Sequence, residues 1–515
     1  MLGDFKRFYR AMRLKAANGN MNAEEPIVPV PIPQSGAQVK ALLEKTFNGS
    51  FDFKVKAFEN DVIIMAFIDG LVDKALIDSS VVQPIMAVMG ELKAAEPKGE
   101  NTTFLRNKLA SMCDLKLMND FNECVNSIMS GNTLLFVDGD TKAINVSLQK
   151  FEKRSIQESH SEAVTRGSRE AFTEALHTNI TLLRRIIKDS SLVFENMTIG
   201  RQTKTSVSMC YIKGTANQEI IDEVRKRLKN IKTEAILESG YIEEYISDSP
   251  FSVFPLVFNS EKPSTVAGKL LEGRVAIICD GTPNVLTVPN LFVDYLQFAE
   301  DYNNRWLFST VIRPARLIAV LISTMGPAFY IALLCFHHDV IPFKLMVTVT
   351  TSLQGAPFSP LIEMLVLTML FEVIKESGLR MASALGQSVS IVGGLIIGQA
   401  AVQAGIFSAP GVVVIAATSI SAFIISKLDA TVFIMRLTLM FAANSIGILG
   451  IALVSLAYFS HACSLKSFGV PYLSPITPLS GKDMKDTFIR MPLWTMLEKP
   501  KTITRRYAQK DTENK

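Results

Sequence analysis

Several signatures of catalysis and metal binding are missing from this sequence of 515 residues. Its six cysteines form no CxxC pair and no regular spacing, which argues against a disulfide framework or a zinc site and favours reduced thiols on the cytoplasmic side. There is no GxGxxG or Walker-type loop and no pattern of a nucleophile beside a base. We therefore expect no enzyme, no cofactor and no metal.

An excess of one charge and a secretory signal are missing as well. The 53 Lys and Arg residues nearly balance the 49 Asp and Glu residues, so the composition does not indicate a nucleic-acid binder. The basic N-terminus is not followed by the continuous apolar core of a signal peptide. We expect residues 1–39 to form a basic leader, either solvated or touching a membrane surface, and a proline-rich extended tether.

Long apolar runs are rare before residue 300 and frequent after it. Residues 1–300 are mixed and charge-rich, whereas residues 317–460 hold nearly all of the long apolar segments. This distribution predicts a multidomain fold in which a cytoplasmic α/β part precedes a polytopic helical transmembrane domain. The expected divisions are α/β subdomains over residues 40–155 and 156–300, a transmembrane domain over residues 301–460 and a basic cytoplasmic tail over residues 461–515.

The α/β part contains an internal repeat. GNTLLFVDGDTKAINV, at residues 131–146, matches GRVAIICDGTPNVLTV, at residues 273–288, with one constant offset. Each stretch predicts a buried strand, a turn containing Asp-Gly and a second strand, because glycine accepts positive φ at no steric cost. A catalytic loop is the less favoured interpretation of the Asp-Gly pair. We predict matching hairpins in two related α/β subdomains.

The segment at residues 317–336 is uncharged and long enough to span the ~30 Å core of a bilayer. Arginines precede it, so the positive-inside rule places the α/β part in the cytoplasm. His337 and His338 follow it and are interpreted as the end of a helix rather than as a metal site. Three further spans are expected, near residues 385–404, 411–426 and 432–459. Four spans return the basic tail to the cytoplasmic side.

A fifth apolar segment does not fit this even count. Residues 342–376 contain Pro342, Pro357 and Pro360 and the polar run TVTTSLQG, which predicts a broken or re-entrant element. Irregular backbone at membrane depth is tolerated only where protein or a water-filled cavity surrounds it. The segment therefore indicates a pore or a cavity.

Two carboxylates, Glu363 and Glu372, lie within that apolar segment. On a continuous helix a separation of nine residues places them on nearly opposite faces, so one helix cannot direct both to the same cavity. Either the helix is broken, or one glutamate faces water while the other contacts a neighbouring helix; the simpler alternative puts both at the membrane interfaces. Arg380 is the nearby cation. Ionisable groups inside a membrane are functional candidates, so all three residues are candidates for a pore or its gate.

The span near residues 385–404 is rich in small residues. Gly394 and Gly398 have GxxxG spacing, which predicts close packing of this span against another helix. Gln387 and Gln399 need hydrogen-bond partners away from lipid, and we include them among the pore candidates.

Several motifs together resemble a known family. The run from PFSPLIEMLVLTMLFEVIKESGLR to GGLIIGQAAVQAG covers residues 357–405, and it is accompanied by EGRVAI..DG.P, EDY, H..IP and SFG.PYLSP at residues 272–283, 300–302, 338–342 and 467–475. In this order, from about residue 35 to 490, the sequence resembles the A-type subunit of the spore germination GerA family. It departs from the family pattern at SEKPS and RGS, residues 260–264 and 166–168.

The resemblance implies a subunit of a nutrient germinant receptor in the inner membrane of a bacterial endospore. Its implied partners are a transporter-like B subunit and a C-type lipoprotein, together with further copies of itself. Such subunits oligomerise, as a pentamer, into a germinant-gated pore for cations. The alternative is a non-conducting scaffold that relays the signal from the B subunit through its cytoplasmic domains.

Overall fold

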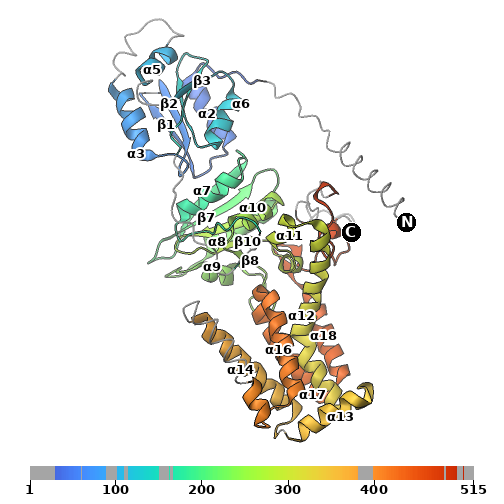
Figure 1. Ribbon diagram of the computed structural model, residues 1–515. Helices are drawn as coiled ribbons and strands as arrows, with labels where there is room; N and C mark the ends of the chain where they lie inside the picture. The colour runs from blue at the N-terminus through green and yellow to red at the C-terminus, as the bar shows by residue number, and fades with distance from the viewer. Residues whose placement is uncertain are drawn as a thin grey trace, which may run out of the picture.

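The computed structural model describes residues 29–59, 61–87, 101–109, 114–149, 162, 166–355, 357–380, 398–480, 483–495 and 503. Figure 1 shows three successive parts: a first α/β unit in blue, a second in green, and a bundle of long helices in yellow to red. The described end of the chain returns to the junction between the second unit and the bundle.

The first α/β unit is built on a five-stranded antiparallel sheet in the order β1-β2-β4-β5-β3. Its central strands are fully buried because helices cover both faces. Along β2, Ile64 and Ala66 face a core shared with α2 and α6, whereas Ile63 and Met65 face α3 and α5. The elements are β1 (Phe53–Phe58), β2 (Ile63–Ile68), β3 (Leu115–Met118), β4 (Thr133–Val137), β5 (Ala143–Val146), α2 (Gly36–Thr46), α3 (Lys74–Ile77), η1 (Asp78–Val82), α5 (Asn101–Leu109) and α6 (Phe121–Met129).

The second α/β unit repeats this arrangement with the strand order β6-β7-β9-β10-β8. Helices α7 and α10 cover one face of the sheet, and α8 and α9 cover the other. Both sheets are antiparallel, and their elements follow the same order along the chain, apart from η1, which directly follows α3 and has no counterpart in the second unit. The elements are β6 (Leu192–Ile199), β7 (Thr205–Ile212), β8 (Phe258–Ser260), β9 (Val275–Cys279), β10 (Val285–Val288), α7 (Leu176–Ile186), α8 (Gln218–Asn230), α9 (Ser239–Ile246) and α10 (Pro263–Leu271).

The two Asp-Gly hairpins form as the repeat predicts. β4 pairs with β5, and β9 pairs with β10, in antiparallel register. The turn glycines, Gly139 and Gly281, have φ values of 91° and 89°, a conformation that a side chain would strain. The first helix, α2, begins before residue 40, so the expected subdomain boundary falls inside that helix.

The aspartates of the hairpins have a second role. Asp138 accepts a hydrogen bond from the backbone N–H of Gly36, at 2.8 Å, and Asp280 accepts one from the N–H of Leu176, at 3.0 Å. Gly36 and Leu176 are the first residues of α2 and α7, whose first N–H groups have no partner within the helix. Each hairpin therefore caps the first helix of its own unit.

The helical part contains two helices, among the described residues, that are long and apolar enough to cross a membrane: Trp306–Cys335 and Ser426–Ile446. Figure 1 shows α12, α16, α17 and α18 side by side, with α13 across the end that is remote from the sheets. The helices are α12 (Trp306–Cys335), α13 (Phe343–Gln354), α14 (Pro360–Arg380), α16 (Ala409–Ile424), α17 (Asp429–Ile446) and α18 (Ile448–Ser464).

The expected single span at residues 432–459 is wrong, because the structure has two helices there. α17 and α18 are joined at Gly447, whose φ is 65°, and they pack against each other as a hairpin. A Cβ on Gly450 would lie 2.2 Å from the backbone oxygen of Ala442, so only glycine allows this approach. The turn is apolar like the helices on either side, and it therefore gives no break in hydropathy.

Residues 342–376 form two helices, α13 and α14, separated at residues 355–359. α14 continues without interruption through Glu363 and Glu372, so the interruption lies before both carboxylates. The segment expected at residues 317–336 lies in α12, and the one near residues 411–426 corresponds to α16. Most of residues 385–404 lies outside the described residues.

Candidate functional site

α14 places its two glutamates in different surroundings. The side chain of Glu363 is fully buried, and its Oε1 accepts a hydrogen bond from the backbone N–H of Ser408. Ser408 is the N-cap of α16, and its Oγ accepts a hydrogen bond from the N–H of Gly411 at 3.1 Å. The hydroxyl of Tyr330, on α12, lies 3.1 Å from the same Oγ. Three helices thus meet at this carboxylate.

The sequence allows this contact because of a glycine. A Cβ on Gly411 would lie 2.8 Å from Glu363 Oε1, closer than side chains tolerate. The carboxylate lies at the N-terminus of α16, where unpaired N–H groups and the helix dipole favour negative charge. Its second oxygen, Oε2, has no hydrogen-bond partner among the described residues. The structure therefore corrects the interpretation that Glu363 lies at a water interface.

Glu372 lies on the opposite face of α14 and is partly exposed. Its side chain, 36% exposed, forms an ion pair with Lys375 one helical turn later. The ammonium of Lys375 also lies 2.5 Å from the carboxylate of Asp429, the first residue of α17. This acid–base–acid group lies at the end of the bundle that is nearer the sheets, and the buried guanidinium of Arg436, on α17, interacts electrostatically with both carboxylates.

The other predicted site residues are less informative. Gln387 and Gly394 lie outside the described residues, as does the side chain of Arg380. Gln399 is exposed. Gly398 faces α16: a Cβ there would lie 3.5 Å from Val412 Cγ1, an ordinary contact, so an added methyl group would fit.

A buried ion-pair network holds the start of α12 against two segments of the chain, one that precedes the bundle in the sequence and one that follows it. Arg313 is fully buried, and its guanidinium contacts Asp301 at 3.0 Å and Asp486 at 2.8 Å. Arg316 contacts the same Asp301 at 2.7 Å, and Tyr302 donates a hydrogen bond to Asp486 at 2.5 Å. Asp301 and Tyr302 belong to α11 (Ala299–Asn303) and to the EDY motif. That motif therefore joins the second α/β unit, α12 and the C-terminal tail.

A second network lies beneath the second sheet. Asp294, in η2 (Phe292–Tyr295), forms a bidentate ion pair with Arg274, and Lys269 approaches it at 3.1 Å. Burial opposes charge on Asp294, but the two cations lower its pKa to about 2. Burial, and then the like charge of Arg274, lower the pKa of Lys269 to about 8.

The chain after α18 packs back onto the second unit. It forms a short hairpin of β11 (Lys466–Ser467) and β12 (Val470–Pro471), and Val470 enters the core of the second sheet. Ser467 Oγ donates to the carbonyl of Leu256 at 2.7 Å and accepts from the N–H of Asn290 at 3.0 Å. The SFG.PYLSP motif thus holds the end of α18 against the second unit.

The connection between α16 and α17 forms a further joint. Lys427, in η4 (Ser426–Leu428), lies 2.7 Å from Glu162 Oε1 and donates to the carbonyl of Asn259 at 2.7 Å. Its ammonium also lies over the ring of Phe258, 4.1 Å from the centroid. The helical part and the second unit are therefore joined at α12, at the α16–α17 connection and at the end of α18.

The two α/β units meet at one buried ion pair. The guanidinium of Arg184, on α7, makes two bonds to Asp52, of 2.7 and 3.0 Å, and its exposed fraction is 0%. Ser50 supports the pair, because it donates to Asp52 at 2.6 Å and accepts from Arg184 at 3.1 Å. No sequence pattern indicates this pairing across 132 positions.

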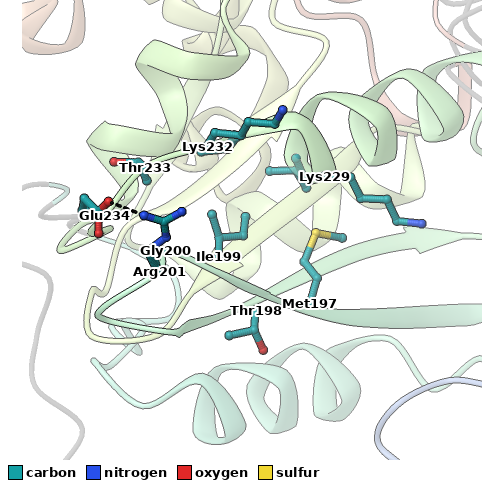
Figure 2. Close-up of a pocket in the computed structure, with 11 residues that line it drawn as sticks. Met197, Thr198, Ile199, Gly200, Arg201, Lys229, Lys232, Thr233 and Glu234 are labelled. Atoms are coloured by element: carbon teal, nitrogen blue, oxygen red, sulfur yellow. Dashed lines mark hydrogen bonds and ion pairs between the residues drawn. The ribbon is translucent and has the colours of Figure 1, made fainter.

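An open pocket of about 610 Å³ lies between the β6–β7 turn and the C-terminal end of α8. Figure 2 shows Arg201, Lys229 and Lys232 around an apolar floor that includes Met197 and Ile199. The cations are exposed, and Arg201 is paired with Glu234 at 3.3 Å. No residue of the motifs lines the pocket, so the motifs point to the joints around the helices instead.

Comparison with known proteins decides the family. The model of the family described as Bacillus/Clostridium GerA spore germination protein matches residues 41–502. The chain belongs to the GerA family. Membership supports a role of this GerA-family chain in spore germination and in a germinant receptor.

The relatives are similar over most of their length. Spore germination protein KA of Bacillus subtilis (strain 168) is 38% identical over 93% of this chain and 88% of its own. Spore germination protein A1 of the same organism is 35% identical, over 77% and 82%. YfkQ, described as an uncharacterized membrane protein of that organism, is 40% identical over 87% and 86%. With the two long apolar helices, this likeness supports membrane association of the GerA-family chain.

Among solved structures, the chain is similar to the N-terminal domain of the A subunit of the Bacillus megaterium spore germinant receptor GerK3. The sequences are 35% identical, the match covers 53% of this chain and 100% of that domain, and the TM-score is 0.41.

Proposed function

We propose that this chain is the membrane subunit of a spore nutrient germinant receptor and that its copies form a germinant-gated cation channel. The observation that carries the proposal is the partly exposed Glu372 on α14, a helix that packs against the largely apolar helices of the bundle. Ionisable groups in such a position are functional by default, and rings of acidic side chains attract cations in channels. In an oligomer, each copy would contribute one such group.

The two glutamates have different proposed roles. Glu363 is a packing residue, because its carboxylate is buried and fixes α14 to the start of α16. Glu372 faces the aqueous pathway, with Lys375 and Asp429 setting the local charge. This assignment follows the expectation that the two carboxylates do not behave alike.

The bundle supports a topology in which both ends of the chain lie in the cytoplasm. α14 starts beside the N-terminus of α16 and ends near the N-terminus of α17, so it runs the length of the bundle, about 30 Å for its residues. α12, α16, α17 and α18 run lengthwise as well. The Arg313–Asp486 contact also holds the tail beside the start of α12.

Two surfaces are available for lipid or for other copies of the chain. α14 exposes an apolar stripe at helical spacing: Ile362, Val366, Met369 and Val373. α13 is exposed along most of its length. We propose that these helices assemble the copies into a pentamer.

The proposed setting is the inner membrane of the endospore, with a transporter-like B subunit and a C-type lipoprotein as partners. We propose that the α/β units, assigned to residues 40–155 and 156–300, receive or transmit the signal. The joints at α12, at Lys427 and at the end of α18 would carry a movement of the second unit to the helices.

The alternative function is a scaffold that does not conduct ions. It is favoured by the same joints, because an element that relays movement to partner proteins also needs firm contacts at several points. Ion flux through the purified protein in liposomes separates the two functions. The channel requires cation flux that depends on the germinant when the partner subunits are present, whereas a scaffold gives none under any combination of partners.

A further inference from the structure

One exposed turn of the second α/β unit lies against the ends of two bundle helices. Thr431, on α17, donates a hydrogen bond to the carbonyl of Val253 at 2.6 Å. Ser252 Oγ lies 3.1 Å from Nε2 of His461, on α18. The ring of Phe254 lies edge-on to that of Tyr458, with 6.4 Å between centroids. The turn at residues 249–254 is therefore held in place by the helices themselves.

These contacts fix the depth of the turn along the bundle. Thr431 lies five residues after Ser426, where the long apolar segment Ser426–Ile446 begins, which is about 7 Å along a helix. Tyr458 lies six residues before the end of α18, which is about 9 Å. The turn thus overlaps the first turns of α17 and the last turns of α18 instead of lying above them.

The side chain at the tip of this turn is a fully exposed phenylalanine. Phe251 has an exposed fraction of 103%, although the three residues that follow it contact the bundle. On the adjacent α9, Tyr241 and Tyr245 are 46% and 54% exposed, and their spacing of four residues puts them on one face. Figure 1 shows α9 at the edge of the second unit that is turned towards the helices.

We propose that Phe251 inserts into the interfacial layer of the bilayer that the helices span, with Tyr241 and Tyr245 at the level of the lipid headgroups. Aromatic side chains are enriched in this layer, where the ring is apolar and a tyrosine hydroxyl remains in water. Lipid is favoured over a partner protein because the same end of the bundle exposes another large apolar side chain: Phe423, near the end of α16, is 64% exposed. The inference rests on the proposed function, since it requires the helices to cross a membrane.

The consequence is a further point of support for the second α/β unit, besides its joints to α12, to the α16–α17 connection and to the end of α18. An aromatic anchor in the membrane surface would set the angle between this unit and the membrane. A change in that angle would be transmitted to α17 through the Thr431–Val253 hydrogen bond.

The test uses tryptophan fluorescence in the full-length protein reconstituted into vesicles whose acyl chains carry bromine near the headgroup. Trp306 and Trp494 are first replaced by phenylalanine, so that each variant has one tryptophan. Phe251→Trp is the reporter and Tyr245→Trp is a second reporter in case the first is poorly folded. Phe423→Trp reports whether the helices lie in the bilayer. Leu76→Trp, at an exposed position on α3 of the first unit, is the control outside the membrane.

We expect bromolipid to quench Phe251→Trp and Phe423→Trp strongly and to leave Leu76→Trp unchanged. If Phe423→Trp is quenched but both reporters behave like Leu76→Trp, the membrane anchor is refuted while the proposed function stands. Blue-shifted emission without quenching at both reporters means that protein covers the turn, and it also refutes the anchor. If Phe423→Trp itself escapes quenching, the helices do not cross the bilayer, and the proposed function fails together with the anchor.

Discussion

Glu363, on α14, accepts a hydrogen bond from the backbone N–H of Ser408, the N-cap residue of α16. The contact joins two helices that are 45 positions apart, and it leaves Glu363 Oε2 without a partner among the described residues. A carboxylate that looks like a pore residue in the sequence is thereby part of the packing of one chain.

This contact predicts unequal effects of two substitutions at residue 363. Glu363→Leu removes the acceptor and leaves the Ser408 N–H buried without a partner, which costs about 1–3 kcal/mol of stability. Glu363→Gln keeps an oxygen in the same place and should cost less. Thermal unfolding of the purified protein in one detergent checks this order. Equal midpoints for the parent and Glu363→Leu would contradict the packing role.

The Arg313 network predicts that the C-terminal tail is held by Asp486. Asp486→Asn removes one of the two carboxylates around a fully buried guanidinium, and breaking such a pair costs about 3–5 kcal/mol. We expect residues 483–495 to become sensitive to thermolysin, whereas the exposed neighbour variant Ile489→Ser should digest like the parent. Equal resistance in Asp486→Asn would show that the tail is held by other contacts.

The junction of the α/β units depends on the shape of a guanidinium. Arg184→Lys keeps the charge but cannot form both bonds to Asp52, so the junction should loosen. Amide hydrogen exchange should increase at Phe51, whose N–H donates to the carbonyl of Phe194 across the junction. The control is Arg185→Lys, at a more exposed pair with Glu170. No difference between the two variants would refute the role of the bidentate pair.

The lowered pKa of Lys269 predicts that this residue adds to the stability of the folded protein in alkaline solution. Its pKa is lowered from 10.5 to about 8 in the folded protein, so between these values the unfolded chain binds more protons. The contribution of Lys269 to the free energy of unfolding should therefore increase from about pH 8 towards pH 10.5, by up to about 3 kcal/mol. Burial raises the pKa of the thiols of Cys124, Cys210 and Cys279, which lowers the stability of every variant above about pH 9, so the quantity to measure is the difference between the parent and Lys269→Met. This difference should grow over the interval, whereas the exposed-site variant Lys229→Met should follow the parent. A difference that stays constant with pH would contradict the prediction.

Local patterns allowed part of the fold to be predicted. The hairpins at Gly139 and Gly281 were predictable because Asp-Gly between apolar runs specifies a turn through the backbone of glycine. The same reasoning failed at Gly447, where the turn between α17 and α18 is apolar on both sides and hydropathy does not change. Opposite placement of Glu363 and Glu372 followed from helical geometry alone.

The contacts at the candidate site were not predictable, because they join distant positions. Lys375 was overlooked as the partner of Glu372, since the sequence pointed to Arg380 and gave no reason to bring Asp429 close. Asp486 lies 173 positions from Arg313, and only the packing of the tail brings the two together. The motifs indicated that residues near positions 300 and 470 are important for function. They did not indicate that these residues join the helices to the second α/β unit.

The most direct test of the channel compares cation flux through liposomes containing the receptor with the parent chain, Glu372→Gln, Glu363→Gln and the exposed control Glu219→Gln, with the oligomeric state measured in parallel. We predict that Glu372→Gln assembles normally and lowers flux about fivefold, since a charge at 4 Å in water attracts a cation by about 1 kcal/mol. Glu363→Gln and Glu219→Gln should conduct like the parent. Parental flux through assembled Glu372→Gln would contradict the assignment of this carboxylate to the cation pathway.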